Sequence, residues 1–270
     1  MTAKERLNLF FNSSPIYAKR SLGQNFLVSD YAIEMMLNKL KVINSENIIE
    51  IGPGPGALTD LILKLKKNYS TIELDQVFAE YWSSKGIKVF NQDALKFDWD
   101  LFENKLDSTL ISNLPYQISS SIVIDRSMDD APFSNMVLMF QKEVAQKIRA
   151  KNKTSDFSLL SLIAQTFWQM ETLCDLGPRD FTPAPKVASR VLHFKSKKTE
   201  IKNKKNYLQF SKAAFKQKRK MLKSNLMQYN NLKELDLLDV MAELKISKTA
   251  RAEELSTEDF VNLYQKLGYL

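Results

Sequence analysis

The sequence predicts an α/β fold in which a doubly wound parallel sheet is followed by a small all-helical domain. In the first 195 residues, short apolar, β-branched segments alternate with amphipathic segments of helix length. That order is typical of a parallel sheet with helices on both faces. Beyond about residue 206, apolar residues recur only at helical spacing. We therefore expect two domains, residues 1–195 and residues 196–270.

The individual elements follow from the same two periodicities. Six strands are expected, over residues 47–51, 71–74, 87–90, 109–112, 136–140 and 191–194. In the C-terminal part, helices are expected around 207–215, 221–226, 235–244 and 260–267. A capping-type sequence that begins at Ser256 precedes the last of these helices. The run 195–205 has no apolar periodicity and predicts a solvated linker.

Composition excludes several classes of protein. The only cysteine, Cys174, rules out a disulfide framework and a multi-cysteine zinc site, and the only histidine, His193, rules out a histidine-rich metal site. We expect no metal and interpret both residues as structural. No apolar run approaches the roughly 18 residues of a membrane span, and residues 1–11 lack the apolar core of a secretory signal. We expect a cytoplasmic protein and, without coiled-coil heptads, a monomer.

The positive charge is concentrated in one segment. The chain has a net charge of +8 over 270 residues. Residues 195–223 contain twelve Lys or Arg residues and a single acid, Glu200, so the rest of the chain is slightly acidic. A basic patch of this kind is either a solvated face or a binding surface for an anionic partner.

Three of the seven glycines, Gly52, Gly54 and Gly56, lie directly after the expected strand 47–51. Glycine lets the backbone turn tightly there and approach a ligand near the N-terminus of the next helix. The spacing is neither that of a dinucleotide fingerprint nor that of a P-loop. Alone, the motif indicates either a ligand site or a tight turn without a ligand.

Polar residues also lie at the ends of the next three expected strands. Glu73 lies 21 positions after Gly52, which suits a carboxylate that binds ribose hydroxyls, and Asp93 suits an exocyclic amine. The turn Asn113-Leu114-Pro115-Tyr116 follows the fourth strand. Each acid alone is typical of a helix cap, and the turn alone is typical of a buried tyrosine. Because parallel strands end at one sheet edge, together they predict a site for an adenosine-containing ligand.

Seven segments in order along the chain resemble the S-adenosylmethionine-dependent rRNA adenine N6-dimethyltransferases, and most closely their small-subunit branch (KsgA/RsmA). They are residues 23–27, 50–59, 72–75, 92–94, 113–116, 181–187 and 215–220. The family often has proline, aspartate and asparagine where this chain has Ala184, Ala188 and Gln117. The resemblance implies a Rossmann-like methyltransferase domain and a helical RNA-binding domain. It also implies N6-dimethylation of two adjacent adenosines in the 3′-terminal hairpin loop of 16S rRNA, and a role in small-subunit biogenesis.

The resemblance also implies a role for each matched position. The cofactor would be bound by Asn25 and Leu27 of the N-terminal arm, Gly52 at its amino-acid end, Glu73 at the ribose, Asp93 and Ala94 at the adenine, and Asn113 at the junction with the target base. We expect the Asn113 oxygen and the Leu114 carbonyl to accept the two N6 hydrogens. Tyr116 and Phe181 would sandwich the base after it leaves its stack. For Phe181, the residue type alone favours core packing.

The basic patch completes the predicted site. The residues expected to bind phosphates, on one or two helix faces, are Lys216, Lys218, Arg219, Lys220 and Lys223. The expected partner is folded 16S rRNA in an immature 30S subunit. Two alternatives remain open: a 23S rRNA adenine methyltransferase of the macrolide-resistance type, and a non-catalytic ribosome-assembly factor. A nicotinamide dehydrogenase is disfavoured by the glycine spacing.

Overall fold

The computed structural model describes residues 1–13, 23–43, 45–227, 229 and 232–268, which form two compact units. The first unit comprises Met1–Ile122, Ala131–Ala145 and Met170–Ser196, and the second comprises Val123–Asp130, Gln146–Gln169 and Lys197–Leu270. The segment after residue 196 thus groups with two stretches from earlier in the chain. The division into functional domains at residue 195 stays a prediction.

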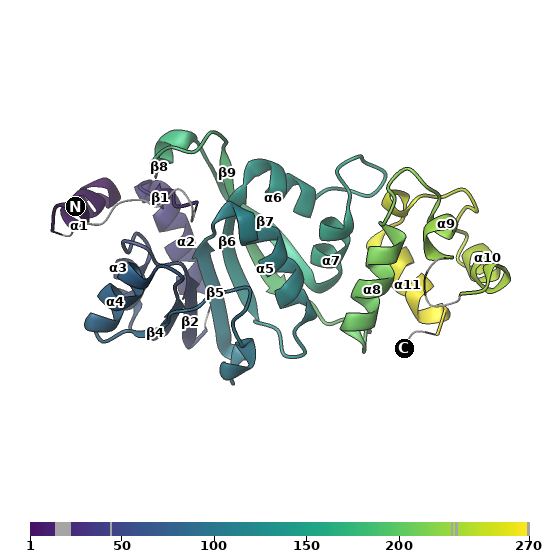
Figure 1. Cartoon of the computed structure of the whole chain (residues 1–270), viewed down its shortest axis with the longest axis horizontal. Helices are drawn as coiled ribbons and strands as arrows, with labels where there is room; N and C mark the ends of the chain where they lie inside the picture. Colours follow the sequence, from purple (N-terminus) through teal and green to yellow (C-terminus); the bar gives the residue numbers. More distant parts are fainter. Residues whose placement is uncertain (14–22, 44, 228, 230–231, 269–270) are drawn as a thin grey trace. The chain divides into compact units, whose positions relative to one another are not determined.

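In the part of the chain that is described, the main sheet has seven strands in the order β4-β3-β2-β5-β6-β9-β7 (Figure 1). These are β4 (Lys88–Phe90), β3 (Asn68–Ile72), β2 (Asn47–Ile51), β5 (Ser108–Asn113), β6 (Asn135–Gln141), β9 (Ser189–Ser196) and β7 (Trp168–Leu176). The first five strands are parallel, and the order reverses between β2 and β5, which is the arrangement of a Rossmann-like sheet.

Two details of the sheet correct the sequence prediction. The strand expected at residues 191–194 is antiparallel to β6, with Val137 opposite His193, so the sheet is mixed and not parallel throughout. The strand β7 was not expected, because its polar residues interrupt the apolar pattern. β7 and β9 are neighbours in the sheet, and residues 177–188 connect them. This connection contains no α-helix, whereas a parallel pair of strands needs a long crossover connection, usually a helix.

The first unit also contains several helices. They are α1 (Ala3–Ser13), α2 (Asp30–Val42), α3 (Thr59–Ile62) and α4 (Gln76–Ser84), together with the first parts of α5 (Tyr116–Met128) and α6 (Lys142–Ile148). The buried side of α2 packs on residues of β2, β5, β6, β7 and β9 in one core. A separate two-stranded sheet pairs β1 (Phe26–Leu27) with β8 (Phe181–Thr182).

The second unit is helical apart from the first residues of β7, as expected for its C-terminal part. It contains α7 (Leu159–Phe167), α8 (Lys204–Ala214), α9 (Leu222–Leu226), α10 (Glu234–Glu243) and α11 (Thr257–Lys266). Tyr207 and Phe210 of α8 pack edge-on or tilted against Tyr264 of α11, with ring centroids 5.2 and 5.5 Å apart. The predicted cap is confirmed, since Ser256 and Asp259 form a capping box.

The linker predicted for residues 195–205 is shorter than expected. Lys195 pairs with Asn135 in the sheet, and α8 already begins at Lys204. Ile201, between them, is buried. The sequence pattern failed here because lysines can occupy strand and helix positions whose side chains reach water.

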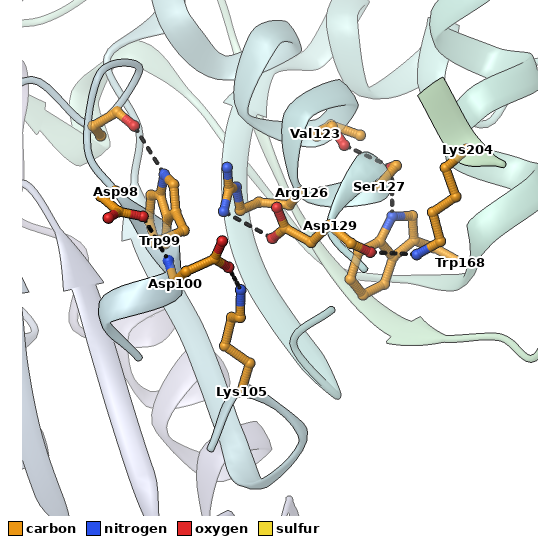
Figure 2. A network of polar contacts seen from close by, with 11 residues as sticks. Asp98, Trp99, Asp100, Lys105, Val123, Arg126, Ser127, Asp129, Trp168 and Lys204 are labelled. Carbon is orange, nitrogen blue, oxygen red and sulfur yellow. Dashed lines mark hydrogen bonds and ion pairs between the residues drawn. The ribbon is translucent and has the colours of Figure 1, made fainter. Parts of the chain in front are cut away.

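Buried polar groups tie the segments of each unit together (Figure 2). In the second unit, the Trp168 indole donates to the Ser127 hydroxyl at 2.8 Å, and Lys204 donates to the carbonyl of Asp129. In the first unit, the buried Lys105 ammonium pairs with Asp100 at 2.7 Å. Among the described residues, no helix is both long and apolar enough to cross a membrane.

Candidate functional site

The glycine turn after β2 combines an open position with a crowded one. Gly52 has a φ of 66°, and a Cβ atom there would meet nothing within 4 Å. At Gly56, with a φ of 91°, a Cβ atom would lie 2.6 Å from the Trp82 ring. Trp82 also donates its indole N–H to the Gly54 carbonyl at 2.9 Å. The turn is therefore fixed by Trp82 on one side, while Gly52 faces open space that a ligand can enter.

Glu73, directly after β3, is a buried carboxylate held by the backbone. Its Oε1 accepts the Asp75 N–H at 2.8 Å, and its Oε2 accepts the Gly54 N–H at 3.2 Å. Burial raises the pKa of Glu73 to about 7, even though these hydrogen bonds act in the opposite direction. Each oxygen still has a lone pair for a hydroxyl donor, so the geometry suits the predicted ribose contact.

Asp93 and Ala94 lie beyond β4 and line a second cavity with Gly52 and Glu73. The Asp93 side chain accepts the Leu95 N–H at 2.9 Å, as in a helix-cap turn. The Trp99 indole donates to the Ala94 carbonyl at 3.1 Å, which keeps this loop in place. The structure thus brings the adenine-binding candidates to the same sheet edge as the ribose candidate.

The turn after β5 carries the candidate catalytic groups. The Asn113 amide donates from Nδ2 to the Asn25 carbonyl at 3.0 Å. A carbonyl can only accept, so this contact determines the amide orientation and leaves Oδ1 as the acceptor for another partner. Leu114 is buried, and Tyr116 is half-buried at the start of α5.

One open cavity collects most of the predicted residues. Its lining includes Asn25, Leu27, Gly52, Glu73, Asn113, Leu114 and Tyr116. Gly52 and Glu73 line both this cavity and the one at Asp93, so the two are adjacent parts of one site.

Phe181 does not join this group. It is 3% exposed, pairs with Leu27 through β1 and β8, and belongs to the core beneath the sheet. It lines neither cavity. The structure places Phe181 in the core, as its residue type alone predicted, and the expected sandwich with Tyr116 stays a prediction.

Glu50 is a site residue that the sequence argument missed. It lines the main cavity and is 2% exposed, and its Oε2 accepts hydrogen bonds from Tyr69 at 2.6 Å and Thr59 at 2.8 Å. Burial raises its pKa to about 7. The signal was present in the sequence, because an acid inside an apolar strand directly before the glycine turn is unusual in a buried parallel strand.

The predicted basic residues all belong to the second unit, but four of the five are not on a helix as expected. Lys216, Lys218, Arg219 and Lys220 are exposed in the loop between α8 and α9, and Lys223 lies on α9. The buried Asn225 side chain donates to the carbonyls of Ala214, the last residue of α8, and Gln217 at 2.8 and 3.0 Å, and so satisfies these backbone acceptors. Phe215 anchors the loop by stacking on Phe260.

Cys174 and His193 have the structural roles expected of them. Cys174 is buried in the core, and burial raises its pKa to about 11, so it is a poor nucleophile at neutral pH. His193 contacts Glu171 and Asn135, both at 2.8 Å. Among the described residues, no group of three or more His, Cys, Asp or Glu side chains is arranged to hold a metal ion. The expectation that no metal is required stays a prediction.

The sequence pattern of the family described as "Ribosomal RNA adenine dimethylase" matches residues 17–268. The chain belongs to this family. It is thus an rRNA adenine dimethylase of the S-adenosylmethionine-dependent methyltransferases. Residues 17–22 of the matched region lie outside the described part of the structure.

Relatives of the dimethylase cover nearly its whole length. It is 51% identical over 270 residues to "Ribosomal RNA small subunit methyltransferase A" of Bdellovibrio bacteriovorus, covering 99% of this chain and 98% of that one. It is 36% identical over 255 residues to the protein of the same name from Mycoplasmopsis pulmonis, covering 93% and 99%.

Solved structures confirm the fold. The dimethyladenosine transferase of Plasmodium falciparum matches with a TM-score of 0.76 at 23% identity, covering 90% of this chain and 98% of that one. The 23S rRNA methyltransferase ErmE matches with a TM-score of 0.65 at 20% identity, covering 90% and 99%. At these identities the likeness bears on the fold alone.

Proposed function

We propose that this dimethylase methylates N6 of two adjacent adenosines in the 3′-terminal hairpin loop of 16S rRNA, within an immature 30S subunit. The observation that carries the proposal is the identity of 51%, over almost the whole of both chains, to a protein named as a small-subunit methyltransferase. The cavity at the carboxyl ends of β2, β3, β4 and β5 supports it, because its polar groups match those that an adenosine cofactor and a target adenine need.

The residues present fit S-adenosylmethionine. Gly52 leaves open space beside the backbone, and Glu73 offers oxygens for ribose hydroxyls. Asp93, in the loop that Trp99 keeps in place, would bind the adenine. Asn25 and Leu27 add the wall formed by the N-terminal arm, and the backbone N–H of Ala94 would contact the adenine ring. When bound, the cofactor supplies a methyl group on an activated sulfonium, so no metal is needed.

The chain must therefore mainly position the adenine nitrogen, whose lone pair is delocalised into the ring. The Oδ1 of Asn113 accepts one N6 hydrogen and the carbonyl of Leu114 accepts the other. These two acceptors favour a tetrahedral nitrogen with its lone pair free to react. Tyr116 stacks on the base once it has left the RNA stack. Phe181 would cover the other face of the base, as the resemblance to the family implies.

The basic loop binds phosphates of folded rRNA. Lys216, Lys218, Arg219 and Lys220 are exposed and, with Lys223, supply the positive charge for salt-dependent contacts. We further propose that the dimethylase acts in the cytoplasm as a monomer and takes part in small-subunit biogenesis.

The deciding experiment is transfer of labelled methyl groups from S-adenosylmethionine to immature small subunits that lack the modification. Large subunits serve as the control, and nucleosides are identified by mass. We expect N6,N6-dimethyladenosine in the small-subunit rRNA only. Label in the large-subunit rRNA would instead support the macrolide-resistance type of activity. Binding of cofactor and RNA without transfer would support a non-catalytic assembly factor.

A further inference from the structure

The hydroxyl of Tyr116 is bound by a serine from a distant part of the chain. The Tyr116 oxygen and the Ser189 Oγ lie 2.8 Å apart, although 73 residues separate them in sequence. Ser189 is 0% exposed and is the first residue of β9, where it pairs with Gln141 of β6. The serine is thus held rigidly by the sheet, whereas Tyr116 lies at the edge of the cavity.

This contact has a counterpart at the other end of the turn. Asn113 is held by the carbonyl of Asn25, also from outside the turn, at 3.0 Å. Two of the four residues that line the cavity from this turn, Asn113 and Tyr116, are therefore each held by one hydrogen bond to another segment. For Tyr116, the bond acts on the atom farthest from its backbone, where it most restricts the tilt of the ring.

We propose that Ser189 is a positioning residue for methyl transfer: it holds the ring of Tyr116 in the plane on which the target adenine stacks. The inference rests on the proposed function, since it takes Tyr116 to be the stacking group. Stacked rings interact only over a narrow range of tilt and offset, and a small displacement of a bound reactant lowers its rate of reaction. A ring free to tilt would therefore present the adenine nitrogen less accurately.

The test is a double-mutant cycle with Ser189→Ala, Tyr116→Phe and the combined variant. Each single change removes one side of the same hydrogen bond, so we expect each to lower kcat about 3- to 10-fold. The combined variant should be no slower than either single variant. The Kd for S-adenosylmethionine, measured by calorimetry, should not change. The second methyl transfer should suffer more than the first, which would raise the fraction of N6-monomethyladenosine.

A matched control is Ser108→Ala at the opposite end of β5. Ser108 is also buried, with its hydroxyl donating to the Asn104 carbonyl at 2.6 Å. The Ser108→Ala variant should lose about as much thermal stability as Ser189→Ala, while keeping the wild-type kcat and product ratio. Tyr116→Phe keeps the test decisive if Ser189→Ala folds poorly, because it leaves the buried strand unchanged.

Two outcomes would overturn the inference. One is additive losses in the double-mutant cycle. The other is that Ser189→Ala keeps the wild-type kcat and product ratio while Tyr116→Ala is inactive. This second result would not contradict the proposed function. Failure of the proposed function is distinct, because the wild-type chain itself would then not methylate small-subunit rRNA.

Discussion

The cavity at the strand ends and the basic loop between α8 and α9 differ in how they are built. In the cavity, polar atoms such as those of Glu73 and Asn113 are held by backbone groups at 2.8–3.2 Å. In the loop, Lys216 and its basic neighbours are exposed at the surface, where Lys218 donates to the Ser155 carbonyl. Lys223, on α9, lies 3.5 Å from Glu234.

This difference separates two kinds of recognition. A site that aligns reacting atoms needs few groups in precise positions, so the loss of one is severe. A surface that binds phosphates needs many charges near the backbone of the RNA, so losses accumulate and depend on salt. Variants of the cavity and of the loop should therefore fail in different ways.

The largest expected effect is that of Asn113→Ala. Removing the acceptor for an N6 hydrogen should lower kcat by about 10²- to 10³-fold, which is the size seen when one group that stabilises a transition state is removed. The measurement is single-turnover methyl transfer, with cofactor affinity by calorimetry as the control. Near-normal turnover would remove Asn113 from the mechanism.

Next is charge reversal of Lys218, Arg219 and Lys220 to Glu. It should weaken rRNA binding by about 10²-fold at low salt and flatten the dependence of affinity on salt, because phosphate contacts are lost. Filter binding over a salt series measures both. The matched control reverses three exposed lysines of the first unit, Lys64, Lys66 and Lys88. Equal affinity of the loop variant and the wild type at low salt would contradict the assignment.

A smaller loss is expected for Glu73→Gln. The amide would present an N–H group to one of the two backbone donors that now bind the carboxylate, and it would lose the charge toward the ribose hydroxyls. We expect the Kd for S-adenosylmethionine to rise about 10- to 30-fold. Calorimetry measures this, and rRNA affinity should be unaffected. An unchanged Kd would exclude Glu73 from the cofactor site.

The smallest effect concerns Glu50 and pH. Burial raises its folded-state pKa from 4.5 to about 7, so the folded chain binds more protons than the unfolded chain between these values. The free energy of unfolding should therefore fall as pH rises through this window. Glu50→Gln keeps an acceptor for Tyr69 and Thr59 but does not ionise. Urea unfolding at pH 5.5 and 8 should show the wild type losing on the order of 1 kcal/mol relative to the variant. If the wild type and Glu50→Gln lost the same free energy of unfolding between pH 5.5 and 8, the prediction would be wrong.

Most of the fold was predictable because local patterns and tertiary structure agree. The apolar run 47–51 forms β2 with the expected bounds, and the helices expected at 235–244 and 260–267 are present within two or three residues. β7 and the direction of β9 were not predictable. The first has polar residues that face water, and strand direction depends on the path of the connection.

The candidate site also has a part that the sequence predicts and a part that it does not. The order of strands along the chain already places Gly52, Glu73, Asp93 and Asn113 at one sheet edge, since parallel strands end together. The sequence therefore determined the class of fold, the family and the position of the cavity. It could not determine that Ser189 holds Tyr116, or that the Asn25 carbonyl orients the Asn113 amide. These depend on contacts between segments that are distant along the chain, and such contacts form only when the whole sheet packs.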